Sequence, residues 1–408
     1  MVYKKSDFIL VAIFIFPGLI ATTKLGGAIY ALILLFGLAL GWSAWRFLES
    51  WEKRVLVGFV LFFLLLSISV INTQDMQNGI KRLGRLIHFP LIIPMYLLLR
   101  KYQIETGKIF LMGAVFSTVV MFGLAFYQVV ILGWDRAVGA TNAIMLGDIA
   151  MLIAVIIACS LLTVAKTWKH YVIGAVAILL AVSASVLTVA KGAWILVPVI
   201  IVWLLWLKRK DMDKVSFILV VAVSTLSIVG LLSVDKVKNR LNVALKEYEL
   251  HIENPGLNNT SSIGPRIEMW RDSITIWQSN PVLGTGLGDY ATDRYNLYKS
   301  GESNLEVAYA HAHSIYFEVL STAGLVGLIS MLVLMLLLPF KAFYSFWLKE
   351  QNVWIKFYAL SGMATVIAFA IFGLTEAWVV RNAFVRMYLI CILVFMSSIA
   401  LILCKNEH

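Results

Sequence analysis

Charged residues are scarce in this 408-residue chain, at 14% of the total, whereas a soluble domain averages about 25%. Apolar residues make up 61%, and the mean hydropathy is +0.87. This balance excludes an ordinary soluble domain and indicates an integral membrane protein. The net charge of +11 does not point to nucleic acid, because the basic residues lie between apolar runs. Membrane orientation and contact with anionic lipids explain them better.

Cysteine is also scarce. Cys159, Cys391 and Cys404 fall in or at the edge of apolar segments, without the spacing of a metal or redox motif. A disulfide framework or a zinc site is therefore not expected. The sequence also lacks an internal repeat and a convincing signal-peptide cleavage site after the apolar run that follows Lys4 and Lys5. We therefore expect that run to be retained as the first membrane helix.

The apolar runs are long enough to cross a membrane as about 12 helices, some of them short or tilted. An even number of spans puts both termini on one side, and the denser basic residues on that side predict that it is the cytoplasm. The predicted spans are residues 8–22, 26–42, 55–72, 86–99, 109–132, 145–165, 171–189, 193–207, 215–233, 315–338, 354–379 and 384–404.

One long polar segment, residues 234–312, is predicted to lie outside the cytoplasm and to hold short helices over the membrane face. A charged amphipathic helix is expected at residues 236–250. A second helix is expected to start at Pro265, since proline is favoured in a first turn, and to end before Pro281. The predicted fold is therefore an all-α membrane protein with nine spans in 1–233, the loop at 234–312 and three spans in 313–408.

Basic residues on the outer side need an explanation, because topology disfavours them there. Contact with lipid headgroups accounts for Lys24. Several arginines can hold a pyrophosphate at the bilayer surface, because the planar guanidinium matches phosphate oxygens. Lys81, Arg82 and Arg85 suit this role above an apolar run, and Lys191 is confined to a very short turn. Arg136 is assigned the same pyrophosphate-binding role, and the remaining outer-side basic residues of the short loops are Arg381 and Arg386.

Carboxylates within or beside apolar runs are functional candidates by default, and these are Asp148, Glu318 and Glu376. Glu318 follows His313 by five residues and is a candidate for orienting that histidine. The three are scattered in the sequence without a DxD-like pair, so we expect no metal and no cofactor in the reaction. The run from Gly284 to Gly288 lacks the preceding strand of a nucleotide-binding fold, so it is interpreted as a turn.

His313 stands where the polar segment gives way to an apolar run, so its imidazole can meet both lipid-borne and soluble reactants. For an isolated histidine at the start of a helix, an interfacial position without chemistry is the favoured interpretation. Gly324 and Gly327 follow on one predicted helical face, a spacing that lets another helix pack closely. The pattern His313-Ser314, nine residues, Gly324, two residues, Gly327 resembles the signature of the bacterial O-antigen ligase family.

The loop is also similar to this family, from Arg266 through Trp270 to Pro281 and Gly286. The resemblance implies a C-type glycosyltransferase that moves a glycan from undecaprenyl pyrophosphate to lipid A–core at the periplasmic face of the inner membrane. It further implies that Arg266 and Lys191 bind the pyrophosphate and that His313 acts on the acceptor hydroxyl. The family often has arginine near position 191, so lysine there loses a bidentate contact.

Rival functions stay open at this point. The larger group includes O-antigen polymerases and protein O-oligosaccharyltransferases, which the sequence separates poorly from a ligase. A transporter of lipid-linked or anionic solutes is the non-enzyme alternative. It would predict broken helices in two matching halves, which the sequence does not show.

Overall fold

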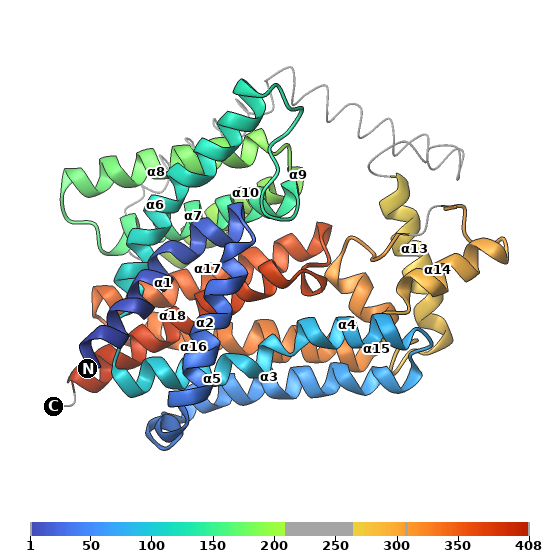
Figure 1. The fold of residues 1–408 in the computed structure, drawn as a ribbon, viewed down its shortest axis with the longest axis horizontal. Helices are drawn as coiled ribbons and strands as arrows, with labels where there is room; N and C mark the ends of the chain where they lie inside the picture. Colours follow the sequence, from blue (N-terminus) through green and yellow to red (C-terminus); the bar gives the residue numbers. More distant parts are fainter. Residues whose placement is uncertain (1, 209–263, 307–308, 407–408) are drawn as a thin grey trace.

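The computed structural model describes residues 2–208, 264–306 and 309–406, and every regular element within them is a helix (Figure 1). This confirms the predicted all-α membrane class. Eight helical segments are long and apolar enough to cross a membrane, and three further apolar helices are shorter. The predicted span at 215–233 and the helix at 236–250 lie outside the described residues. The count of twelve spans therefore stays a prediction.

The first half of the chain contains ten α-helices and their short extensions. Their bounds are α1 (Val2–Thr22), α2 (Leu25–Leu40), η1 (Trp42–Phe47), α3 (Ser50–Ile68), η2 (Ser69–Asn72), α4 (Met76–Leu86), α5 (His88–Tyr102), α6 (Gly107–Phe126), η3 (Tyr127–Ile131), α7 (Ala143–Thr163), α8 (Trp168–Leu187), α9 (Lys191–Trp194) and α10 (Leu196–Lys208). The second half has α13 (Gly264–Ser279), α14 (Tyr290–Lys299), α15 (Ile315–Ser330), η4 (Met331–Leu337), α16 (Leu338–Lys349), α17 (Val353–Thr375), η5 (Trp378–Val380) and α18 (Asn382–Asn406).

The centre of the bundle is formed by α7, α17 and α18, whose side chains are buried almost all round. Apolar residues cover every face of these helices, as expected of helices surrounded by other helices. In Figure 1, α1 begins and α18 ends at the left of the bundle, while α13 and α14 lie at the right. Both chain ends thus share one end of the bundle, and the polar loop helices lie at the other.

Helix α13 occupies the place predicted for the second loop helix, from Gly264 to Ser279. Trp270 on it donates its indole N–H to the Ala312 carbonyl at 3.0 Å and stacks on Phe317 with ring centroids 5.4 Å apart. Ile274, one turn after Trp270 on α13, is exposed. The tryptophan therefore fixes α13 against the beginning of α15, which carries the histidine motif.

Helix α15 is broken at Gly324, where φ is 62° and ψ is −162°. A Cβ there would lie 2.4 Å from the Val282 carbonyl oxygen, so only glycine fits. The segment after Pro281 pairs with the break, because the N–H of Thr285 donates to Ser321 at 3.1 Å and that of Leu325 donates to Pro281 at 2.9 Å. The expectation of a helix packing on an unbroken Gly324–Gly327 face is therefore wrong. A loop makes the close approach instead.

The same glycine-rich loop is tied to the turn between α3 and α4. Asp289 accepts hydrogen bonds from the N–H groups of Gln74 at 2.7 Å and Asp75 at 2.8 Å. Gly288 lies so close to α4 that a Cβ would be 2.5 Å from the Gly79 nitrogen. The loop therefore holds α4 and α15 together at the end of the bundle, and it positions the arginines of α4 beside the histidine motif.

Candidate functional site

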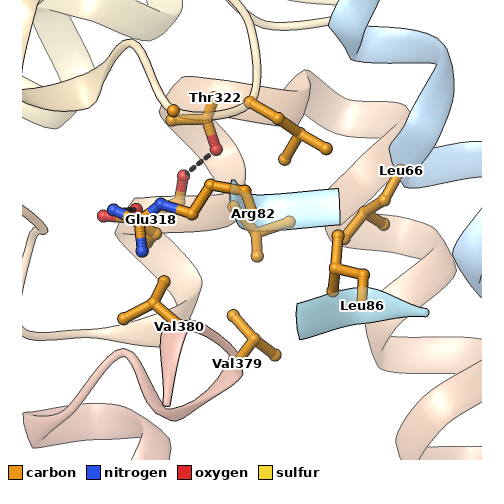
Figure 2. A pocket seen from close by; sticks show the side chains of 10 residues that line it. Leu66, Arg82, Leu86, Glu318, Thr322, Val379 and Val380 are labelled. Atoms are coloured by element: carbon orange, nitrogen blue, oxygen red, sulfur yellow. Dashed lines mark hydrogen bonds and ion pairs between the residues drawn. The ribbon is translucent and has the colours of Figure 1, made fainter. Parts of the chain in front are cut away.

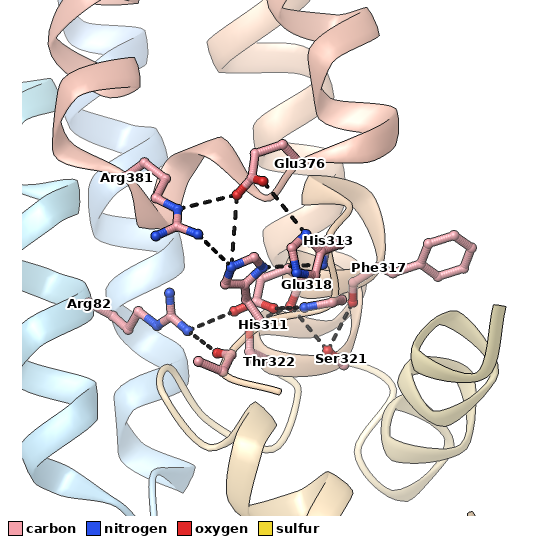
Figure 3. Close-up of polar contacts among 11 residues, drawn as sticks. Arg82, His311, His313, Phe317, Glu318, Ser321, Thr322, Glu376 and Arg381 are labelled. Carbon is pink, nitrogen blue, oxygen red and sulfur yellow. Dashed lines mark hydrogen bonds and ion pairs between the residues drawn. The ribbon is translucent and has the colours of Figure 1, made fainter. Parts of the chain in front are cut away.

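Two histidines, one carboxylate and one arginine meet at this end of the bundle (Figure 3). Helix α17 ends at Thr375, so Glu376 leaves it in an extended conformation that turns the side chain toward His313. The Glu376 Oε2 and His313 Nδ1 atoms are 3.6 Å apart, and Arg381 Nε lies 3.3 Å from Glu376 Oε1. The predicted span at 354–379 is thus too long by one turn, and that difference places Glu376 in the site.

His313 has a left-handed backbone, with φ of 50°, just before Ser314 begins α15. Such a conformation costs a non-glycine residue about 1–3 kcal/mol, and such strain is concentrated at functional sites. Its side chain is 24% exposed although its Nδ1 atom is buried against Glu376. The second ring nitrogen, Nε2, is therefore the one available to a substrate.

Glu376 is fully buried, which alone would raise the pKa of its carboxyl group. His313, His311 and Arg381 together outweigh burial and lower that pKa to about 2. The carboxylate is consequently ionised at physiological pH. It holds its charge next to a histidine that would become positive on accepting a proton.

His311 was not singled out by the sequence. Burial, with the charges of His313 and Arg381, lowers its pKa to about 3, although Glu376 opposes that shift. Arg381 Nη2 lies 3.0 Å from His311 Nε2, and an arginine can only donate, so that nitrogen accepts and the ring is neutral. His311 therefore accepts from Arg381 through Nε2, with its proton on Nδ1, rather than carrying charge.

A second buried pair supports the cluster from below. Glu318 Oε1 lies 3.2 Å from Arg82 Nη2, and its Oε2 accepts the Ala312 N–H at 2.8 Å. Arg82 also donates to the Ala310 carbonyl at 2.7 Å. Glu318 thus fixes the backbone of the histidine segment and does not touch His313 directly, contrary to the sequence interpretation. Figure 2 shows this pair at the rim of a small pocket with aliphatic walls, including Leu66, Leu86, Val379 and Val380.

Arg266 lies two residues into α13 and is half-buried. Burial lowers the pKa of its guanidinium, while the carboxylates of Glu376 and Asp148 raise it. Among the residues that the structure describes, it forms no hydrogen bond or ion pair. Asp148 on α7 is fully buried, and both of its carboxylate oxygens lack a partner within the same ranges. Arg266 and Asp148 thus both lie near Glu376, and neither has a hydrogen-bond or ion-pair partner among the described residues.

Lys191 is exposed at the start of α9. The residue after it, Gly192, is packed on the end of α17, since a Cβ there would lie 2.2 Å from the Thr375 hydroxyl. Two residues before it, Val189 has a φ of 58°, which is rare for a β-branched side chain. Lys191 therefore lies on a strained turn beside the end of α17, which Glu376 directly follows.

The remaining predicted cations differ in placement. Arg85 is half-buried without an ion pair among the described residues, whereas Arg82 is already engaged by Glu318. Lys81 is exposed and contacts neither pair, so Arg82 and Arg85 are the α4 cations that face inward. Arg136 is exposed next to Ala137, whose N–H bonds to Leu187 near the Lys191 turn. The structure thus brings Arg82 to the cluster and leaves Lys81 outside it.

His311, His313 and Glu376 are also a potential metal-ligand set, with one ligand atom from each lying within 4.8 Å of the others. The sequence did not predict this grouping. Arg381 lies against two of the three groups, at 3.0 Å from His311 and 3.3 Å from Glu376. A divalent cation there would face a guanidinium at short range, which is electrostatically unfavourable. The ligand set therefore fits the protein's own cation better than a metal.

The sequence could flag Glu376 only as a carboxylate at the end of an apolar run. Its partner His313 lies 63 positions away, at the start of another helix. Arg381 was visible only as one of the outer-side cations. The pairing depends on where α17 ends and how η5 turns, and neither leaves a pattern in local sequence.

Together, fold and site define a multi-pass helical membrane protein with a histidine–carboxylate–arginine cluster at one end. Residues 176–332 match the family model described as O-antigen ligase, a range that includes Lys191, Arg266 and His313. An uncharacterised protein of Haemophilus influenzae is 26% identical over 341 residues, covering 82% of this chain and 83% of that protein. The family match confirms, over these residues, the resemblance to the O-antigen ligase family seen in the sequence, and the activity of that family is glycosyl transfer of the ligase or polymerase kind.

Proposed function

We propose that the protein is an O-antigen ligase that transfers a glycan from undecaprenyl pyrophosphate to lipid A–core oligosaccharide at the periplasmic face of the bacterial inner membrane. The observation that carries the proposal is the position of His313 between buried Glu376 and the open end of the bundle. In this arrangement Nδ1 of His313 faces the Glu376 carboxylate, and Nε2 is available to accept a proton from the substrate.

In the proposed reaction, a hydroxyl of the core sugar attacks the anomeric carbon of the donor glycan. The hydroxyl proton passes to Nε2 of His313, and the bond from the anomeric carbon to the pyrophosphate oxygen breaks. Glu376 stabilises the imidazolium that results. The 3.6 Å separation is longer than a hydrogen bond, as is common before substrate binds. A positioned general base of this kind contributes about 10²–10⁴-fold to the rate.

The departing undecaprenyl pyrophosphate gains negative charge as the bond breaks. Arg266 is the best-placed cation to receive it, because it is half-buried and has no ion pair among the described residues. Lys191 and Arg85 supply further positive charge from α9 and α4. Cations fixed before reaction contribute on the order of several kcal/mol to such a transition state. This mechanism needs no metal.

The test is a transfer assay with purified protein, lipid-linked glycan and one acceptor at a time. The ligase proposal predicts joined product with lipid A–core. A polymerase would instead lengthen the glycan on a second carrier, and a protein O-oligosaccharyltransferase would glycosylate a protein acceptor. Absence of all three products, with uptake of labelled lipid-linked glycan into vesicles, would replace the enzyme with the transporter.

A further inference from the structure

Arg386 is a cation that the proposed transfer does not use. It lies on α18, one turn after the helix begins, and is half-buried. Its Nε donates to His88 Nε2 at 3.3 Å, and its Cζ lies 5.4 Å from the ring centre of Tyr30. No carboxylate within the described ranges forms an ion pair with it. A guanidinium inside a membrane-spanning helix is costly without a counter-charge, so its surroundings favour an anion.

Two groups beside Arg386, His88 and Tyr30, have a polar hydrogen that can be donated to an anion. His88 accepts from Arg386 through Nε2, so its ring is neutral and its proton lies on Nδ1. That Nδ1 atom and the Tyr30 hydroxyl are both buried without a hydrogen-bond partner among the described residues. His88 is 8% exposed and Tyr30 1%, and their rings meet edge to face at 5.1 Å. A guanidinium without an ion pair among the described residues, beside two buried donors that lack an acceptor, is typical of an anion site and not of a structural ion pair.

The first turn of α2 adds positive potential at the same place. A Cβ on Gly27 would lie 2.6 Å from Arg386 Nη1, so the guanidinium lies directly over this turn. The start of this 16-residue helix carries a partial positive charge that favours an anion, although the N–H groups of Leu25 and Gly27 are already bonded to Thr23 and Lys24. Lys24 precedes the helix. The Arg386 side chain and the start of α2 therefore both contribute positive charge here.

We propose that Arg386, Tyr30, His88 and the first turn of α2 form a binding site for the phosphate group of a membrane lipid. The site lies where α18 enters the bundle, five residues beyond Arg381 of the histidine cluster. It is distinct from that cluster, because Arg381 and not Arg386 contacts Glu376. The inference does not depend on the proposed transfer reaction, and it is tested by binding alone.

The experiment measures lipid binding to the full-length protein in a non-ionic maltoside detergent, with native mass spectrometry to count the lipids retained. Phosphatidylglycerol, undecaprenyl pyrophosphate and inorganic pyrophosphate are titrated separately. The variants are Arg386→Gln and Tyr30→Phe, with Arg46→Gln as the control. Arg46 is an exposed arginine of η1, after the other end of α2.

At least one of the two lipids should bind to the wild type with an affinity that Arg386→Gln lowers by about tenfold or more, the worth of one charge-assisted hydrogen bond. Tyr30→Phe should weaken the same binding by about threefold to tenfold. It should leave the melting temperature of the lipid-free protein unchanged or higher, because the hydroxyl has no partner there. If Tyr30 had only a structural role, Tyr30→Phe would not weaken lipid binding while leaving the melting temperature unchanged or higher.

The three ligands identify the source of the phosphate. Preference for undecaprenyl pyrophosphate would assign the site to the carrier lipid, and preference for phosphatidylglycerol would assign it to the bulk membrane. Either result supports the proposal. Binding of inorganic pyrophosphate as tight as that of both lipids would overturn the lipid assignment. If Arg386→Gln and Arg46→Gln lost lipid-binding affinity equally, or if Arg386→Gln lost none, the proposed site would be overturned.

Discussion

Two buried glutamates at opposite ends of the bundle are each paired with arginine, and they differ in how fully their oxygens are bonded. Glu52 opens α3 and lies 2.8 Å from Arg100 Nε, at the end of α5. It also accepts from the Tyr96 hydroxyl and from its own N-cap N–H at 2.7 Å. Glu376, in contrast, has an Oε2 atom without a hydrogen bond. It lies 3.6 Å from Nδ1 of His313, which also lacks a hydrogen bond among the described residues.

The comparison separates a structural pair from a reactive one. A fully bonded buried carboxylate has no capacity left for a new proton or partner, so Glu52 can only join α3 to α5. Glu376 and His313 keep bonding capacity in a partly open setting. Glu52 lies within a membrane-spanning segment and Glu376 directly follows one, and both are fully buried. The two carboxylates are therefore distinguished by the hydrogen bonds that their oxygens make, not by burial.

The largest expected effect at the reactive end is that of His313→Ala. Removing the base should lower the transfer rate by about 10²–10⁴-fold or more. The variant should still insert and fold, because the ring makes no close side-chain hydrogen bond. Rates are measured on purified protein whose melting temperature matches the wild type. Substantial turnover by such a variant would remove His313 from the mechanism.

Arg266→Lys sharpens the comparison, because Arg266 has no ion pair among the described residues whereas Arg100 is bonded to Glu52. If Arg266 holds pyrophosphate with its planar fork, lysine should cost on the order of 100-fold in rate, nearly as much as alanine. Arg271→Lys, an exposed change on the same helix, is the matched control. An Arg266→Lys enzyme within a few-fold of wild type would show that the residue only anchors α13 near headgroups.

Glu376→Gln and Glu52→Gln form a direct contrast. Glu376→Gln should slow transfer by at least about tenfold, as part of the general-base contribution. It should change stability modestly, since the Arg381 side chain is 35% exposed and can be hydrated. Glu52→Gln should cost about 3–5 kcal/mol, because it leaves Arg100 buried and unpaired. Its folded fraction should keep the wild-type rate. Melting temperatures and transfer rates are measured for both variants. A large loss of stability in Glu376→Gln with a slowed rate in Glu52→Gln would refute the contrast.

Chelation should have the smallest effect. Arg381 lies where a metal would contact His311 and Glu376, so EDTA should leave the transfer rate unchanged. The rate is compared before and after chelation and after adding magnesium or manganese. A loss that either metal restores would mean that the three-residue ligand set binds a metal during turnover.

Much of this fold is visible in the sequence, because membrane spans are long apolar runs and Pro265 marks the start of α13. The break at Gly324 is not visible, since small residues suit both a packed helix face and a left-handed interruption. The pairing of Glu376 with His313 depends on where α17 ends, to within one turn. Arg82 could be predicted as an outer-side cation but not as the partner of Glu318. Contacts between distant helix ends leave no local periodicity, so they needed the structure.

The central claim is that His313 and Glu376 act as one unit, and a double-variant cycle tests it most directly. Transfer rates are measured for wild type, His313→Ala, Glu376→Gln and the double variant, all checked for equal folding. Groups that act together are strongly non-additive. The account predicts that the double variant is no slower than His313→Ala alone. A double variant slowed by the product of the two single losses would contradict it, because Glu376 would then act independently of the histidine.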